Sequence, residues 1–99
     1  MTEETSAVKV VRNEAEQRWE AEVGGSLALI TYDERDGTLY LLHTEVPTAA
    51  EGQGIGGQLV KAALEHARGA GMKVAPFCAF ANAYMRRHKE YEDLRADEE

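Results

Sequence analysis

The first half of the chain alternates between apolar and polar residues, which is the period of a half-buried β-strand. The alternation is strict around Trp19, Ala21 and Val23, which fall on one face. Gly24-Gly25 follows at once, and two adjacent glycines favour a tight hairpin turn. Pro47 ends the last stretch of this kind. The pattern predicts four strands, over residues 8–11, 18–23, 26–32 and 38–46.

After Pro47 the spacing of apolar residues becomes that of an amphipathic helix. Ile55, Leu59 and Ala63 recur at spacing four, and Val60, Leu64 and Ala67 widen the same stripe. The remaining pattern predicts a helix, a strand and a second helix, over residues 58–68, 72–75 and 79–88.

The second of these helices carries Phe80, Tyr84 and His88 at spacing four. Beyond it, Tyr91 and Leu94 are expected to fold back onto the domain.

The order of these elements predicts the fold. Four strands in a meander pair antiparallel, whereas a strand, a helix and a strand in succession form a right-handed βαβ unit with parallel strands. We therefore expect an α+β fold: a mixed, mostly antiparallel five-stranded sheet with a βαβ unit and two helices.

The length of 99 residues fits one small domain. We expect a disordered N-terminus over residues 1–6, a single domain over residues 7–94 and an acidic tail over residues 95–99.

Of the 18 acidic and 11 basic residues, six acidic and two basic ones lie after residue 88, so the net charge of −7 belongs largely to the ends. This charge argues against nucleic acid as a partner.

The cysteine and histidine content narrows the chemistry further. A single cysteine, Cys78, excludes an internal disulfide and a cysteine-based metal cluster, which favours a cytoplasmic protein. The three histidines lie far apart, so we expect no metal site. No apolar run is long enough to span a membrane, and no membrane partner is expected.

A glycine-rich loop, Gly52-Gln53-Gly54-Ile55-Gly56-Gly57, lies between a predicted strand and a predicted helix. Glycines let the backbone approach a ligand closely, and the N-terminus of the next helix offers free N–H groups and a partial positive charge. Together these favour an anion site suited to a pyrophosphate. The alternative is a flexible turn with close helix–sheet packing. No lysine of a P-loop follows, and the loop is misplaced for a dinucleotide-binding fold.

This loop resembles the acyl-CoA pyrophosphate loop of the GNAT superfamily of N-acetyltransferases. More narrowly, the chain resembles the very small GNAT-like proteins of about one hundred residues that carry a central cysteine. The resemblance extends over most of residues 18–94, in the stretches His43-Thr44-Glu45-Val46-Pro47, Ala63-Leu64-Glu65-His66-Ala67-Arg68, Val74-Ala75-Pro76-Phe77-Cys78 and Tyr84-Met85-Arg86-Arg87-His88-Lys89-Glu90-Tyr91.

The resemblance implies an acetyl-CoA-dependent N-acetyltransferase with an amine acceptor that the sequence does not identify, present as a monomer or weak homodimer. It implies cofactor contacts from Val46, Gln53, Gly54, Ile55, Gly56, Gly57, Asn82 and Arg87. Two positions depart from the usual pattern. Glu51 stands where the superfamily has Arg or Gln, and Lys89 stands where the small family often has proline.

Four residues are candidates for the chemistry. His43 and Glu45 share one parity with Leu39 and Leu41 on their strand, and either could act as a base. The alternatives are a hydrogen-bonded core histidine and a solvated glutamate.

Cys78 begins the last helix, where a helix N-terminus favours the thiolate, so it is a candidate acetyl acceptor with His43 as its partner. A small buried hydrophobe is the alternative. The resemblance adds Tyr84 as a proton donor to the leaving thiolate, although a core tyrosine fits its spacing equally well. Likewise, the basic run around Arg87 is either a contact to the 3′-phosphate of CoA or a solvated face.

The same residues admit two other functions. A non-catalytic CoA-binding or acyl-CoA-binding module with a regulatory or interaction role would keep the loop without turnover. A small interaction domain would use the loop only as structure.

Overall fold

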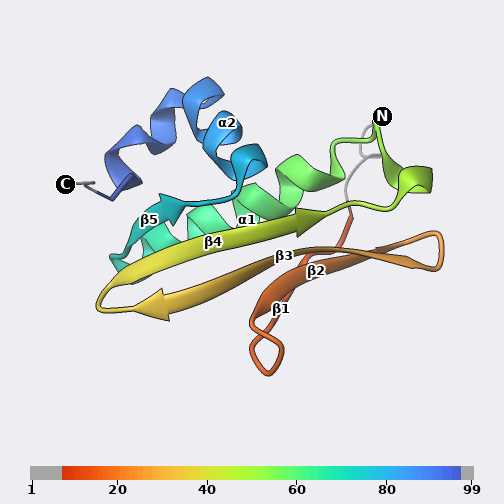
Figure 1. The fold of residues 1–99 in the computed structure, drawn as a ribbon, viewed down its shortest axis with the longest axis horizontal. Coiled ribbons are helices and arrows are strands. Elements are labelled where there is room, and N and C mark those ends of the chain that lie inside the picture. Colours follow the sequence, from red (N-terminus) through yellow and green to blue (C-terminus); the bar gives the residue numbers. More distant parts are fainter. Residues whose placement is uncertain (1–7, 97–99) are drawn as a thin grey trace.

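The computed structural model describes residues 8–96, so the expectations for residues 1–6 and for the last three residues of the tail lie outside the described residues. Five strands form one sheet in the order β1-β2-β3-β4-β5, and α1 packs across one of its faces (Figure 1). The elements are β1 (Val11–Asn13), β2 (Arg18–Val23), β3 (Ser26–Arg35), β4 (Thr38–Glu45), η2 (Thr48–Ala50), α1 (Ile55–Ala70), β5 (Lys73–Pro76), α2 (Ala79–Arg87) and η3 (Lys89–Leu94).

The predicted fold class is confirmed. Strands β1 to β4 pair antiparallel. Strands β4 and β5, which precede and follow α1 in the chain, are parallel neighbours in the sheet. This is the expected βαβ unit on a mixed, mostly antiparallel sheet. No helix in the described part of the chain has both the length and the apolar run that a membrane crossing requires.

The alternation of β2 is also confirmed, because Trp19 and Ala21 are buried on the face that packs on α1. The strand after it is longer than predicted. The sequence predicts that β3 ends at Tyr32, but Asp33 pairs with Tyr40 and continues the hydrogen-bonded ladder between β3 and β4. The turn shrinks to Asp36-Gly37, both with positive φ (50° and 79°), because that left-handed pair suffices to reverse the chain.

Two further boundaries differ from prediction. The first strand runs over Val11–Asn13 instead of residues 8–11, since its pairing partners lie at the start of β2. Helix α1 begins at Ile55, three residues early, because the amide of Gln58 donates to the carbonyl of Gly54 and closes a first turn that contains two glycines. The low helix propensity of glycine is outweighed here by burial of Ile55 and Gly56.

The apolar stripe of α1 fills the core. Its predicted members are all buried against the sheet: Ile55, Leu59, Val60, Ala63, Leu64 and Ala67. Tyr91 and Leu94 are buried as expected. The packed chain continues to Ala96, whose amide donates to the carbonyl of Val74 on the outer edge of β5.

The two glycines at the end of α1 offer a matched test of this geometry. A Cβ at Gly69 would meet no heavy atom within 4 Å, and its φ is ordinary, whereas Gly71 ends the helix at a φ of 71°. We predict that Gly69→Ala raises the free energy of unfolding by about 0.5–1 kcal/mol, because alanine has the higher helix propensity. Gly71→Ala lowers it by about 1–2 kcal/mol, because a Cβ disfavours the left-handed region.

Urea denaturation, followed by the fluorescence of the single tryptophan, measures both changes. Destabilisation by Gly69→Ala, or its absence in Gly71→Ala, would contradict the assigned end of the helix.

Candidate active site

A β-bulge in β4 organises the site. Thr31 pairs with His43 and the next residue, Tyr32, pairs with Leu41, so Leu42 is an extra residue on β4. A bulge interrupts the alternation of side chains between the two faces. The sequence predicted one face for Leu39, Leu41, His43 and Glu45, and this is wrong: the two leucines are buried in the core, but the other two are exposed.

His43 and Glu45 do lie together, as predicted. His43 Nε2 is 3.0 Å from Glu45 Oε2, and both side chains are 60% exposed. Their pair lies on the face of the sheet away from α1, since Thr44 between them is opposite the buried Ile30. The pair therefore presents a hydrogen-bonded histidine to an incoming molecule from the open side of the sheet.

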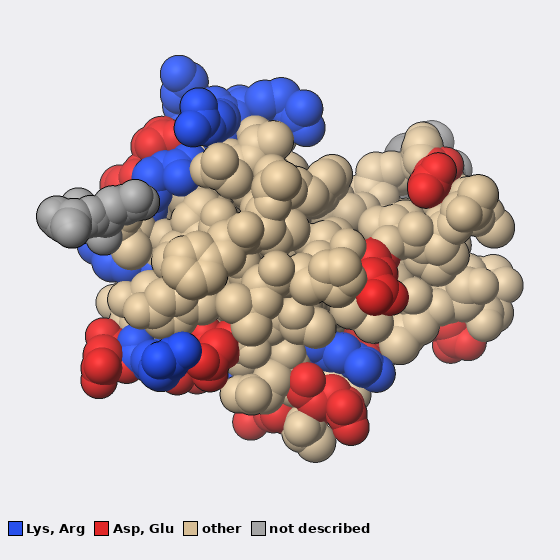
Figure 2. Space-filling view, viewed as in Figure 1, with Lys and Arg blue, Asp and Glu red and all other residues tan. Residues whose placement is uncertain are grey.

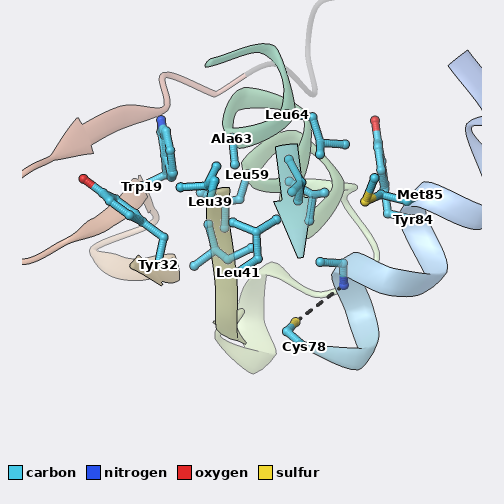
Figure 3. Close-up of a cluster of buried hydrophobic side chains, with 14 of the residues drawn as sticks. Trp19, Tyr32, Leu39, Leu41, Leu59, Ala63, Leu64, Cys78, Tyr84 and Met85 are labelled. Carbon is cyan, nitrogen blue, oxygen red and sulfur yellow. Dashed lines mark hydrogen bonds between the residues drawn. The ribbon is translucent and has the colours of Figure 1, made fainter. Parts of the chain in front are cut away.

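Cys78 lies on the opposite side of β4 from that pair. It is the N-cap of α2, and its Sγ accepts a hydrogen bond from the amide of Ala81 at 3.5 Å (Figure 3). Its side-chain partner is Thr44, whose Oγ1 lies 3.0 Å from Sγ. The expected pairing of Cys78 with His43 is wrong, because the bulge directs Thr44 to the thiol and His43 to the other face.

The backbone of Cys78 is fixed by the same bulge. The amides of Phe77 and Cys78 both donate to the carbonyl of Leu41, at 3.0 and 3.1 Å. This shared acceptor stands where β4 and β5 stop pairing, after Leu41 and Pro76. The separation of the two parallel strands therefore begins directly beside the thiol.

The glycine loop forms the second part of the site. Gly52 and Gly54 have φ values of 83° and 75°, which a residue with a Cβ rarely adopts. Gly54 is the N-cap of α1, no side chain caps the helix, and its first turn contains no acidic residue. Helix α1 thus starts with backbone amides and a partial positive charge directed at this loop.

Two adjoining cavities connect the loop to β4. One, of about 190 Å³, is formed by the glycine loop and its neighbours: Val46, Ala50, Glu51, Gly52, Gly54, Ile55, Gly56, Gly57 and Phe80. The other, of about 640 Å³, crosses the end of β4 and is lined by Leu27, Thr44, Glu45, Val46, Pro47, Thr48, Glu51 and Phe80. Because Val46, Glu51 and Phe80 line both, the two cavities form one groove that leads from the glycine loop to Thr44.

The groove brings together only some of the predicted residues. Glu45, Val46, Gly54, Ile55, Gly56 and Gly57 line it. Gln53 belongs to the glycine loop, but its side-chain Nε2 donates a hydrogen bond to the carbonyl of Ala49 at 3.3 Å. Asn82 accepts a hydrogen bond from Arg95 at 2.8 Å, so its amide oxygen is engaged by the C-terminal segment.

Tyr84 lies in the packing between α1 and α2. It is buried and stacks on His88 with ring centroids 3.9 Å apart, and its hydroxyl points away from Cys78 (Figure 3). Burial raises the pKa of Tyr84, and the carboxylates of Glu90 and Glu65 raise it further. Its position supports a role in packing, and its role as a proton donor to the leaving thiolate of CoA stays a prediction.

Arg87 is exposed near the end of α2, where Lys and Arg side chains gather over that helix (Figure 2). It does not line either cavity of the groove described above. Glu51, by contrast, lines both cavities, and its carboxylate cannot donate a hydrogen bond to a phosphate. Within residues 8–96, no group of three or more His, Cys, Asp or Glu side chains gathers in a way that could hold a metal ion.

Phe80 and Thr44 are groove residues that the sequence did not identify as site candidates. Phe80 is 41% exposed. A Cβ on Gly56 would lie 2.8 Å from Phe80 Cζ, so the ring occupies the space that the glycine leaves open. The signal for this was indirect: a glycine inside the first turn of a helix indicates a close neighbour.

A small mixed sheet with a βαβ unit, diverging parallel strands and a glycine loop at a helix N-terminus defines the acyl-CoA N-acyltransferase class of fold. Residues 18–94 match the family described as GCN5-related N-acetyl-transferase, and the chain belongs to this family. The predicted resemblance to GNAT proteins is thereby confirmed. Members of this family use acetyl-CoA as cosubstrate.

Among solved structures, the chain is similar to a protein from Staphylococcus aureus determined by solution NMR and described as a GCN5-like candidate N-acetyltransferase. The two share 26% sequence identity with a TM-score of 0.69, and the match covers 93% of this chain and 91% of that one. The likeness therefore extends over nearly the whole of both chains.

The contact between Phe80 and Gly56 leads to a testable coupling. We predict that Gly56→Ala is more favourable for stability by about 1 kcal/mol in a Phe80→Ala background than in the wild type, because the added methyl no longer meets the ring. Gly57→Ala is the matched control, since its Cβ would meet Tyr84 at 3.3 Å instead.

Urea unfolding of the four variants in each cycle gives the two coupling energies. A coupling for Gly56 no larger than that for Gly57 would contradict the position of the Phe80 ring.

Proposed function

We propose that this protein is an acetyl-CoA-dependent N-acetyltransferase that transfers an acetyl group to an amine. The observation that carries the proposal is the single groove that joins the glycine loop to Thr44, beside Cys78. Its volume, about 640 Å³ in the larger cavity, falls within the range of about 300–1,000 Å³ common for small-molecule sites.

The glycine loop is the proposed site for the pyrophosphate. Backbone amides at the start of α1 and the positive end of the helix favour an anion there, and Gly56 leaves room for close approach. Val46 on the facing wall is the proposed neighbour of the pantetheine arm. Glu51 opposes this arrangement electrostatically, so the backbone has to supply the favourable contacts.

Two routes of transfer fit the positions of the candidate residues. In the direct route, the amine approaches from the open face, and His43, held by Glu45, removes its proton. The amine nitrogen then forms a bond to the carbonyl carbon, the C–S bond breaks, and CoA leaves as a thiol after it takes up a proton.

In the second route Cys78 loses its proton and its Sγ forms a bond to the thioester carbonyl carbon, which releases CoA as a thiol. The acetyl group is then carried on Sγ until the amine displaces it and the thiol reforms. The amide of Ala81 and the hydroxyl of Thr44 are the groups positioned to hold Sγ.

A non-catalytic acyl-CoA-binding module is the alternative, and specific observations favour it. Cys78 is only 9% exposed, and Thr44, not Cys78, lines the larger cavity. The hydroxyl of Tyr84 points away from Cys78 (Figure 3). A protein that keeps the glycine loop and its groove would still bind acyl-CoA with these features.

Binding is tested first. We predict that CoA at about 100 times its dissociation constant stabilises the folded protein by about 2.7 kcal/mol. We also predict that Glu51→Gln tightens CoA binding by about 0.5–1 kcal/mol at low salt, because a negative charge beside the phosphates is removed.

Isothermal titration calorimetry and thermal unfolding measure these effects. Glu22→Gln is the control, since Glu22 lies on β2 outside both cavities of the groove. No stabilisation of the wild type by CoA or acetyl-CoA would exclude both CoA-dependent functions.

Transfer of the acetyl group is tested by mass spectrometry of the intact protein. We predict that incubation with acetyl-CoA adds one acetyl group to the wild type and none to Cys78→Ala, and that a suitable amine removes it. An adduct that persists in Cys78→Ala would place the acetyl group elsewhere.

The turnover of acetyl-CoA with amines distinguishes the remaining possibilities. Turnover that is unchanged in Cys78→Ala and lost in His43→Ala would favour the direct route. CoA binding without adduct or turnover would favour the binding module.

A further inference from the structure

The two cavities of the groove meet at a shared boundary. Both are walled there by the same three side chains, Val46 at the end of β4, Glu51 in the loop and Phe80 on α2. The smaller cavity contains the exposed start of α1, and the larger one reaches Thr44. A ligand that extends through both cavities, from the glycine loop to Thr44, has to cross this boundary.

The ring of Phe80 stands at that boundary. Its Cζ and Cε2 atoms lie 2.8 and 2.9 Å from the position of a Cβ on Gly56, and Val46 Cγ2 lies 3.5 Å from the same point. The end of the ring therefore rests over the first turn of α1, directly across from Val46. The ring therefore lies on the wall that the two cavities share.

The side chain of Phe80 is partly open to solvent. The side chain is 41% exposed, although large apolar side chains are favoured in the core. Phe77, by comparison, packs on Tyr40 with ring centroids 5.5 Å apart, and no aromatic partner of this kind is found for Phe80 within residues 8–96.

We propose that Phe80 determines which ligands pass from the cavity at the glycine loop to the cavity at Thr44, beside Cys78, because its ring lies between the two and swings out when the pantetheine arm of an acyl-CoA passes. This inference rests on the proposed function, in which the groove takes acetyl-CoA. A binding site that is open in only a fraction of molecules has its apparent affinity reduced by that fraction. In this position the Phe80 ring therefore weakens the binding of a ligand that has a pantetheine arm, but not of a ligand that lacks it.

Two ligands separate these cases. Coenzyme A carries the pantetheine arm, whereas 3′-phosphoadenosine 5′-diphosphate has the nucleotide and the pyrophosphate but no arm. We predict that Phe80→Ala tightens CoA binding several-fold and increases the association rate of CoA. The affinity for 3′-phosphoadenosine 5′-diphosphate stays within twofold of the wild-type value. The CoA affinity and association rate of Phe80→Leu, whose side chain is smaller than that of phenylalanine, lie between those of the wild type and Phe80→Ala.

Phe77→Ala is the matched control. Phe77 is the other phenylalanine of the chain, is 71% exposed and lines neither cavity of the groove, so its removal leaves both affinities unchanged. Calorimetry gives the dissociation constants, stopped-flow gives the association rates, and urea unfolding verifies that each variant is folded.

The outcomes separate this inference from the proposed function. If the wild type binds CoA but Phe80→Ala binds it equally or more weakly, the role of Phe80 is wrong and the proposed function stands. If Phe80→Ala changes the affinity for both ligands alike, the ring acts on the phosphate cavity and the inference is again wrong. If the wild type binds neither ligand, the proposed function fails and the role of Phe80 fails with it.

Discussion

The bulge at Leu42 is the constraint on which the rest of the site depends. One extra residue on β4 reverses which side chains face α1, so Leu41 closes the core while Thr44 turns to Cys78. The carbonyl of Leu41 then takes the amides of Phe77 and Cys78, at the point where β5 leaves β4. A regular strand that buried Leu41 would turn Thr44 to the other face of the sheet, away from the thiol.

The groove follows from this separation together with the start of α1. Where β4 no longer has a neighbour on one side, α2 begins with Cys78 and carries Phe80 over Gly56. The backbone of the glycine loop supplies the proposed anion site, so little of it depends on charged side chains. A chain of 99 residues can in this way combine a cofactor groove with a small core, because the βαβ unit serves both.

Much of the fold could be predicted because it depends on local patterns. The alternation of β2 and the apolar stripe of α1 are each visible in spacing alone. Boundaries were harder to predict. Helix α1 starts within the glycines because packing outweighs propensity, and β3 extends because its partner strand supplies hydrogen bonds.

The sequence by itself determined the order of elements, the parallel pair, the glycine loop and the family resemblance, since periodicity and turn chemistry act between near neighbours in the chain. Only the tertiary structure decided the partners of the candidate residues. His43 faces Glu45 and not Cys78, and Phe80 lies over the groove and not in the core. The physical reason is that a bulge is set by hydrogen bonds between two strands, and the space beside Gly56 is set by the packing of two helices.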